Sequence, residues 1–597
     1  METSFLAQQF VPIMFAGLFV LLLTGFPVAF ALAATGLGFG FIGMEAGLFP
    51  PTLFQALPLR IFGIMQNDTL LAIPFFTFMG IILERSGMAE DLLETVGQVF
   101  GPVRGGVAIA VILVGALLAA TTGVVAAAVI SMGLISLPIM LRYGYSRVIA
   151  TGTITASGTL AQAIPPSLVL IVLADQLGRS VGDMYAGAML PGLLLVGLYI
   201  AFIVVVAIVR PAMVPALPPE ARIYREPNGS SGHRSLLVLL AVSAAVALAW
   251  ARIHDAVLGA LLGRTEPAAG DEVVIMSMTV ASLLGLLLSV INRALRMGLL
   301  SRLAEQVTFV LMPPLILIFL VLGTIFLGVA TPTEGGAMGA LGAMILALFK
   351  RKLDMPLMRQ ALDSTAKLAS FVLFILIGST VFSFTFNAAD GHIWVEHLFD
   401  SMPGGAMGFL IVVNILIFVL GCFIDFFEIA FIVIPLLAPV AEKILPELVP
   451  GMSPDQVMIW FGVIIAMNLQ TSFLTPPFGF ALFYLRSVAP KRDYKDRVTG
   501  QNIPAVTTTE IYKGSIAFIV LQLIMVVAVI TVPSLVTGGM DQKKGLDNEA
   551  VMEQLQESSM VEDESAQKED SPAEEANKDG ASEKSDDDAL KELLNKK

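Results

Sequence analysis

The segments ASGTLAQAIPPS (residues 156–167) and NLQTSFLTPPFG (residues 468–479) interrupt two long apolar stretches, 148–174 and 456–485. Proline lacks an N–H and leaves a carbonyl one turn earlier without its helical partner, so each segment predicts a broken helix. Inside lipid, unwound backbone is tolerated only where protein or a cavity surrounds it. We therefore expect the functional site at these two breaks. The alternative is a pair of proline-kinked helices that bind no ligand.

The composition requires a bilayer as the main solvent. The chain has 597 residues, of which 56% are hydrophobic and 14% are charged, whereas a soluble domain carries about 25% charged residues. Most of the formal net charge of -13 lies after residue 540, so it indicates no acidic or basic substrate and no nucleic-acid partner. One cysteine, Cys422, excludes an internal disulfide framework. We expect an all-α polytopic membrane protein without an organic cofactor.

Two other apolar stretches, 105–141 and 406–440, are too long for one crossing, which needs about 20 residues. The first is interrupted by AATTG at 119–123 and the second near Asp425. Each could be two spans joined by a tight turn, or a re-entrant hairpin that leaves on the side it entered. Cytoplasmic loops collect Lys and Arg, and this rule places both ends of the first stretch inside and both ends of the second outside. We therefore predict two re-entrant hairpins.

Three proline landmarks recur in the same order in both halves of the chain. They pair Pro27 with Pro332, Pro138 with Pro439, and Pro165 with Pro476, at offsets of 305, 301 and 311 residues. Glycine and proline punctuate any polytopic protein, which is the alternative explanation. The near-constant offset and the opposite sidedness favour an inverted repeat, the architecture of many secondary transporters.

The predicted organisation has four parts. They are a first repeat at 1–209, a cytoplasmic loop with an extra transmembrane hairpin at 210–306, a second repeat at 307–536, and an acidic tail at 537–597. The tail has too few apolar residues to bury, so we expect it to be disordered. The last span, 514–536, leaves a basic cytoplasmic loop and predicts a periplasmic tail.

Two carboxylates within apolar surroundings are candidates for function. A carboxylate in an apolar run is costly and suggests a functional site. Asp425 could help to ligate a cation, carry a proton, or cap the second half of its hairpin. Glu334 follows Pro332 and is favoured there by the helix dipole alone. No Lys or Arg falls within the breaks, so an anionic substrate would rely on backbone dipoles, hydroxyls and bound cations.

The break segments, together with ATPTEGGA at 330–337, resemble the large membrane subunit of TRAP transporters, the DctM type, over roughly 10–210 and 307–536. The resemblance implies an elevator-type, Na⁺-driven importer of the wider ion-transporter superfamily, in a bacterial inner membrane, and not an enzyme. Such systems take a small organic anion, such as a carboxylate or sugar acid, from a periplasmic binding protein and pair with a small four-helix membrane subunit. The alternatives are a binding-protein-independent carrier of the same superfamily and, remotely, an intramembrane enzyme or scaffold.

The resemblance also implies which residues hold the ligands, with Na⁺ between each hairpin and its broken helix and substrate between the hairpin tips. Carried over by position, the first Na⁺ site is Thr121, Thr122, Gly123, Ser157, Gly158, Thr159 and Pro165. The second is Asp425, Asn468, Thr471, Thr475 and Pro476. Substrate would lie near Thr122, Gly123 and Asp425, with Ser167 and Gln470 nearby. The 210–306 insertion departs from the family pattern and could substitute for or dock the small subunit.

Overall fold

The computed structural model describes residues 5–221, 223, 232–262, 268, 270–400, 403–477, 479–496, 498–538 and 540. The acidic tail from residue 541 onward, predicted to be disordered, lies outside the described residues. Within that part the chain is nearly all helical, and eleven helices are long and apolar enough to cross a bilayer. Strands β1 (Tyr494–Lys495) and β2 (Asn502–Ile503) form one short antiparallel pair.

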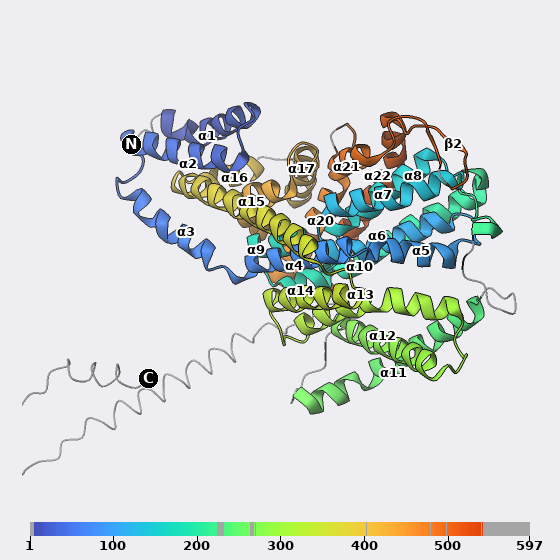
Figure 1. Cartoon of the computed structure of the whole chain (residues 1–597). Helices are drawn as coiled ribbons and strands as arrows, with labels where there is room; N and C mark the ends of the chain where they lie inside the picture. Colours follow the sequence, from blue (N-terminus) through green and yellow to red (C-terminus); the bar gives the residue numbers. More distant parts are fainter. Residues whose placement is uncertain are drawn as a thin grey trace, which may run out of the picture. The chain divides into compact units, whose positions relative to one another are not determined.

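The helices follow one another in two comparable series (Figure 1). The first series comprises α1 (Phe5–Leu23), α2 (Val28–Glu45), η1 (Leu53–Ala56), α3 (Leu57–Met65), η2 (Asp68–Leu71), α4 (Ala72–Arg85), α5 (Met88–Phe100), α6 (Gly106–Thr122), α7 (Val125–Arg142), α8 (Arg147–Thr159), η3 (Leu160–Gln162), α9 (Leu168–Gln176) and α10 (Val181–Val209). Turns η4 (Pro211–Met213) and η5 (Pro219–Ala221) and helices α11 (His233–Leu262) and α12 (Gly270–Leu295) separate it from the second.

The second series comprises α13 (Arg302–Phe326), α14 (Pro332–Phe349), α15 (Met355–Ala388), α16 (Gly391–Asp400), α17 (Gly405–Leu420), α18 (Phe426–Glu428), η6 (Ile429–Val433), α19 (Ile434–Ile444), η7 (Leu445–Glu447), α20 (Pro454–Phe473), α21 (Phe480–Val488), α22 (Thr508–Thr531) and α23 (Ser534–Thr537). Helices α6 and α7 form one hairpin, and α17 to α19 form the other. The pairs α8/α9 and α20/α21 are the two broken helices. The fold class predicted from the sequence is thus confirmed.

Corresponding helices of the two series pack reciprocally. Helix α2 lies against α15 while α4 lies against α14, and α8 lies against α22 while α10 lies against α20. Glycines allow the closest approaches between these helices, because they have no side chain. A Cβ on Gly378 would lie 2.2 Å from the carbonyl oxygen of Ala29, and a Cβ on Gly36 would lie 2.6 Å from the carbonyl oxygen of Val381. Small residues at such crossings let helix backbones meet directly. The two series therefore interlock at both pairs of crossings.

One span is longer, and its counterpart more bent, than the apolar stretches indicate. The predicted span 366–387 lies within the 34-residue helix α15, which Asp354 caps by accepting the Leu357 N–H at 2.8 Å. Its counterpart in the first series, the pair α3 and α4, bends by 45°. At the bend, Asn67 donates to the Asp175 carboxylate at 2.7 Å, and the Thr333 hydroxyl donates to the Asp68 carbonyl. Side-chain contacts, invisible in hydropathy, thus hold the bend.

The first hairpin begins and ends at the same place. The N–H of Gly105, just before α6, donates to the Val214 carbonyl at 2.9 Å. The N–H of Ser146, just after α7, donates to the neighbouring Met213 carbonyl, also at 2.9 Å. One short segment therefore joins both ends of α6–α7, as a re-entrant hairpin requires.

Several ion pairs between described residues connect stretches that the charge distribution assigns to the same side of the membrane. On the predicted cytoplasmic side, Arg142 pairs with Asp496 at 3.1 Å and Arg147 with Glu510 at 2.6 Å. On the predicted periplasmic side, Arg179 pairs with Glu442 and Asp455 at 2.5 Å. The two Arg179 pairs, whose carboxylates are exposed, contribute little stability, about 0–1 kcal/mol each. Their value here is geometric, because they bring the matching loops together.

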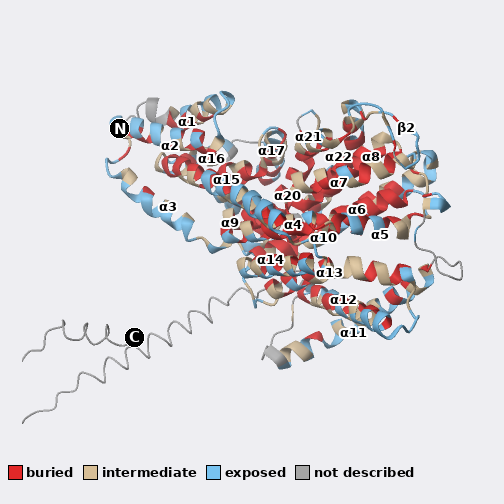
Figure 2. Cartoon of the chain, in the orientation of Figure 1, coloured by how far each residue is buried: buried red, intermediate tan, exposed pale blue. Residues whose placement is uncertain are grey.

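The inserted helices α11 and α12 form a hairpin whose base is closed by polar contacts. Ser301 donates its hydroxyl to the Gly232 carbonyl at 3.0 Å, and its N–H to the Ser235 hydroxyl at 3.0 Å. Near the other end, the buried His254 ring lies 3.1 Å from the Glu272 carboxylate. Helix α11 has many exposed apolar residues, and much of its ribbon has the pale blue of exposed residues in Figure 2. This pattern is typical of a peripheral helix whose outer face meets lipid.

Candidate functional site

The two arms of the first hairpin, α6 and α7, pack against two sides of helix α8, the first half of the broken helix. A Cβ on Gly115 of α6 would lie 2.5 Å from the Ser157 Cβ, and a Cβ on Gly158 would lie 2.3 Å from Val129 Cγ2 of α7. Consecutive residues of α8 therefore touch opposite arms of the hairpin. Gly123 forms the hairpin tip in a left-handed conformation, with φ of 60°. The predicted residues Gly123, Ser157 and Gly158 are thus brought into one clamshell.

The hydroxyls of this clamshell keep their acceptor lone pairs. Thr121 donates to the Leu118 carbonyl at 2.9 Å, Ser157 to Ile154 at 3.0 Å, and Thr159 to Ala156 at 2.9 Å. A hydroxyl that donates its proton backward along the helix can still accept twice. Three buried oxygen acceptors therefore accompany the freed carbonyls of the break, which suits a hard cation such as Na⁺. Pro165 is buried within that break, and the side chain of Thr122 lies outside the described part.

The second hairpin contacts its broken helix through different chemistry. A Cβ on Gly421 would lie 2.3 Å from the Ser472 hydroxyl oxygen, so the hairpin break packs directly on α20. Asn468 donates its amide to the Asn414 carbonyl at 2.7 Å and to the Asn414 side-chain oxygen at 3.0 Å. Thr471 and Thr475 donate one turn backward, to Met467 at 3.0 Å and Thr471 at 2.9 Å. Their oxygens therefore remain acceptors, beside the break that holds Pro476.

The two carboxylate candidates occupy helix starts. Asp425 is the N-cap residue of α18, and its N–H donates to the Glu428 carboxylate at 3.2 Å. Glu334 accepts the N–H of Thr331 at 2.8 Å in a reciprocal capping arrangement. The capping alternative for Asp425 and the dipole explanation for Glu334 thus both match the observed positions. An N-cap carboxylate retains further acceptor capacity, so cation binding by Asp425 stays a prediction.

A buried polar cluster joins the two broken helices. Gln470 of α20 lies within 3.5 Å of both the Thr159 hydroxyl of α8 and the Tyr199 hydroxyl of α10. Gln522 of α22 donates to Tyr199 at 2.7 Å. The side-chain oxygens of Gln470 and Gln522 have no hydrogen-bond partner among the described residues. Gln470, predicted near substrate, therefore faces the protein interior in this conformation.

Residues around the first break include one that sequence reasoning missed. Ser167 is fully buried and donates to the Gln162 carbonyl at 3.1 Å. Both side-chain amide atoms of Gln162 are buried without a partner in the described part of the chain. A buried amide without partners costs about 1–3 kcal/mol, so this group is available to a ligand or water beside Gly158 and Pro165. Its place within the quoted 156–167 segment was the signal that could have singled it out.

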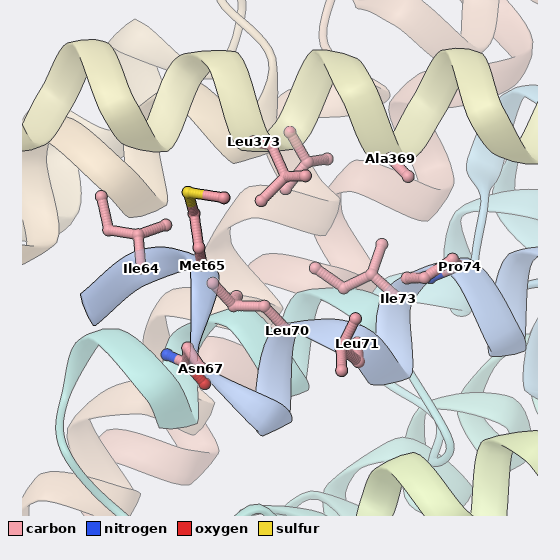
Figure 3. A pocket seen from close by; sticks show the side chains of 10 residues that line it. Ile64, Met65, Asn67, Leu70, Leu71, Ile73, Pro74, Ala369 and Leu373 are labelled. Carbon is pink, nitrogen blue, oxygen red and sulfur yellow. The ribbon is translucent and has the colours of Figure 1, made fainter. Parts of the chain in front are cut away.

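The bend of the outer helices carries a cavity of about 200 Å³. Figure 3 shows Met65 at the end of α3 and Leu70 beyond the bend, below Leu373 and Ala369 of α15. The lining is almost wholly apolar, and Asn67, which contacts Asp175, is its polar member. Such a lining offers no group that would orient a polar substrate. The cavity therefore belongs to the packing of α15 on the bend between α3 and α4, and it shares no residue with the predicted Na⁺ sites.

The fold and the site define a class: a polytopic membrane protein in which two hairpins clasp two broken helices. The family described as "Tripartite ATP-independent periplasmic transporter, DctM component" matches residues 15–535. The chain belongs to this family, the large permease proteins of TRAP transporters. The family is one of transport proteins, consistent with a non-enzymatic role.

Similar proteins with curated names carry several kinds of cargo. The C4-dicarboxylate TRAP transporter large permease protein DctM of Pseudomonas aeruginosa is 27% identical over 74% of this chain and 82% of its own. The ectoine TRAP transporter large permease protein TeaC of Halomonas elongata is 24% identical over 82% and 92%. The solved YdaH transporter of Alcanivorax borkumensis aligns with 81% of this chain and 89% of its own at 15% identity and a TM-score of 0.42.

Proposed function

We propose that this chain is the large subunit of a Na⁺-coupled, binding-protein-dependent importer of a small organic anion in a bacterial inner membrane. Its partners are a periplasmic substrate-binding protein and a small four-helix membrane subunit. The observation that carries the proposal is the clamshell in which Gly115 and Val129 enclose Ser157 and Gly158. Na⁺ would bind to hydroxyl and carbonyl oxygens there and at Asn468, Thr471 and Thr475 opposite.

The mechanism that we propose couples the ions to the anion site. A cation bound between a hairpin and its broken helix would hold the hairpin tip beside the break. The helix N-termini at the tip and at the break would then point toward the anion. The hairpin-bearing body would then move across the outer helices as an elevator. Apolar crossings with a bent pair of helices, α3 and α4, are compatible with such movement.

Uptake by proteoliposomes tests this proposal. The purified chain and its small subunit are reconstituted, and the binding protein is added outside with its radiolabelled ligand. We expect uptake with an inward Na⁺ gradient and little with K⁺ in its place. Undiminished uptake in K⁺ would overturn the coupling. Full uptake of free ligand without the binding protein would instead support a binding-protein-independent carrier of the same superfamily.

A further inference from the structure

A second cavity lies where the first hairpin meets the outer helices. Its volume is about 250 Å³, and its walls come from α4, α15 and the first turns of α7. Residues Val124 and Ala126 place it directly after the hairpin tip, and Arg85 and Glu84 lie at the end of α4. We call it the α4–α7 cavity. Its polar residues distinguish it from the apolar cavity at the helix bend.

Unused hydrogen-bond donors face the α4–α7 cavity from two elements. Helix α7 begins at Val125, and its N-cap residue, Val124, provides no side-chain cap. The N–H groups of the first turn have no partner within a helix, and they carry the positive end of the helix dipole. Thr77 of α4 lines the same cavity, is 3% exposed, and has a hydroxyl without a partner among the described residues. A buried hydroxyl of this kind is satisfied by a ligand or by water.

The two charged residues of the cavity, Glu84 and Arg85, differ in their hydrogen bonds. The Glu84 carboxylate accepts the hydroxyl of Ser131, which ties α4 to the second arm of the hairpin. Arg85 makes no hydrogen bond or ion pair with any described residue, and its side chain is exposed. The guanidinium is a planar fork of donors that matches a carboxylate in two-point contact. An oxyanion in the cavity would therefore have a cation, a helix N-terminus and a hydroxyl as partners. The Glu84 carboxylate also lines the cavity, beside Arg85, and it accepts the Ser131 hydroxyl.

We propose that the α4–α7 cavity binds the oxyanion head group, a carboxylate or sulfonate, of the transported anion, with Arg85 as its counter-charge. The inference rests on the proposed function and adds to it a specificity-determining arginine outside the two breaks. The cavity adjoins the hairpin tip at Gly123 and Val124. An anion that moves from the tip toward Arg85 therefore remains close to positive charge, first at the N-terminus of α7 and then at the guanidinium. Arg85 and Thr77 would thus favour anions over neutral analogues of similar size.

Thiol labelling measures the potential in this cavity without any transport assay. The full-length chain carries Cys422→Ala and Ala126→Cys, and is treated with methanethiosulfonates that bear either a sulfonate or a trimethylammonium group. We expect the sulfonate reagent to react faster than the trimethylammonium reagent. Arg85→Gln should slow the reaction of the sulfonate reagent by about threefold or more, because one nearby unit charge is lost. Arg85→Lys keeps that charge and should leave the rate unchanged. Equal rates in Arg85→Gln and the parent would overturn the role of Arg85. Leu134→Cys, on the exposed face of α7, is the matched control, whose rates should not respond to Arg85.

Protection by added anions tests binding itself. Labelling of Ala126→Cys is repeated with succinate, isethionate or inorganic phosphate at equal ionic strength. We expect succinate or isethionate to slow labelling, and Arg85→Gln to abolish that protection. Absence of protection by all three probes would overturn the proposal, and protection by phosphate alone would show a site for inorganic anions and not for cargo. Ala127→Cys serves as a second reporter if the first variant folds poorly. Because no Na⁺ gradient is used, failure here is distinguishable from failure of the coupling in uptake assays.

Discussion

Gln470 and Thr159 occupy the same place in the two repeats, 311 residues apart, and their side chains meet within 3.5 Å. Pro165 and Pro476 have the same offset. The two broken helices therefore approach each other through equivalent positions. This meeting point is polar, whereas its surroundings are apolar.

The two glutamines that contact Tyr199 should contribute unequally to the free energy of unfolding. Replacing Gln522 by Met removes the 2.7 Å bond to the buried Tyr199 hydroxyl, and we expect a loss of about 1–3 kcal/mol in unfolding free energy. Gln470→Met loses two longer contacts, both at 3.5 Å, to the Thr159 and Tyr199 hydroxyls, so it should cost less. Denaturant titration of the purified protein measures both. An equal or larger loss in Gln470→Met would contradict this reading of the cluster.

The contact between hairpin and broken helix should not tolerate added volume. A Cβ on Gly158 would lie 2.3 Å from Val129 Cγ2 and 3.1 Å from the Val129 nitrogen. Gly158→Ala should therefore displace α7, cost about 1–3 kcal/mol and reduce uptake. Gly197→Ala is the control, because no atom lies within 4 Å of its added Cβ. Unchanged melting temperature and uptake in Gly158→Ala would show that the clamshell is loose.

Sodium should stabilise the protein if the hydroxyl clusters bind it. At a concentration ten times the dissociation constant, one bound ion adds about 1.4 kcal/mol to the folded state. We expect a higher melting temperature in Na⁺ than in K⁺, and Ser157→Ala or Thr471→Val should shrink that difference. Thr324→Val removes a comparable helix hydroxyl away from both breaks and should leave it intact. A difference of the same size in all four proteins would place the ions elsewhere.

The loop that contains Asp496 should lose stability in acid. Asp496 accepts the Thr499 N–H and hydroxyl at 2.8 Å and pairs with Arg142, and these contacts, the Thr499 N–H first, hold the pKa of the Asp496 carboxyl below its ordinary value. A carboxyl with a lowered folded-state pKa stabilises above its unfolded pKa of about 3.9, and that contribution disappears as pH falls through the folded value. Asp496→Asn should therefore lower the melting temperature near pH 7 and flatten its decline below about pH 4. Glu447→Gln, on an exposed carboxylate, is the control, and a decline as steep as the parent's in Asp496→Asn would assign the effect to other groups.

The tail should lie in the periplasm. Helix α22 begins beside the Arg147–Glu510 pair, on the side that basic loops assign to the cytoplasm, and has length for one crossing. A periplasm-dependent reporter fused after residue 540 should be active, and a cytoplasm-dependent one inactive. The reverse result would contradict the predicted topology. A fusion within 489–507 supplies the opposite control.

The elements with strong sequence signals were predictable. Pro165 and Pro476 remove helical hydrogen bonds wherever they occur, so both breaks lie where the prolines indicate. The tip at Gly123 likewise follows from glycine's access to positive φ. Asp425 was found as an isolated carboxylate, and its place at a helix start was one of the alternatives.

Partners in the folded state were not predictable from one sequence. Asn414 contacts Asn468 across 54 residues, and Gln522 contacts Tyr199 across 323. Arg85 ends an ordinary helix, and only the packing of α7 against α4 places it beside the hairpin tip. A hydropathy pattern indicates only whether a residue tends to be buried. The contacts of Asn468, Gln522 and Arg85 depend on which other helix packs against their own, and one sequence does not show that.

The bond from Ser301 to Gly232 has a consequence for the origin of this chain. The two residues are in direct contact there: a Cβ on Gly232 would lie 3.1 Å from the Ser301 Cβ. Helices α11 and α12 therefore depart and return at one point, so a cut-and-join at that point would remove both without stretching the remaining polypeptide. The helix pair has the form of a cassette spliced into a pre-existing loop, and a shortened chain joining Gly232 to Ser301 should keep the core intact.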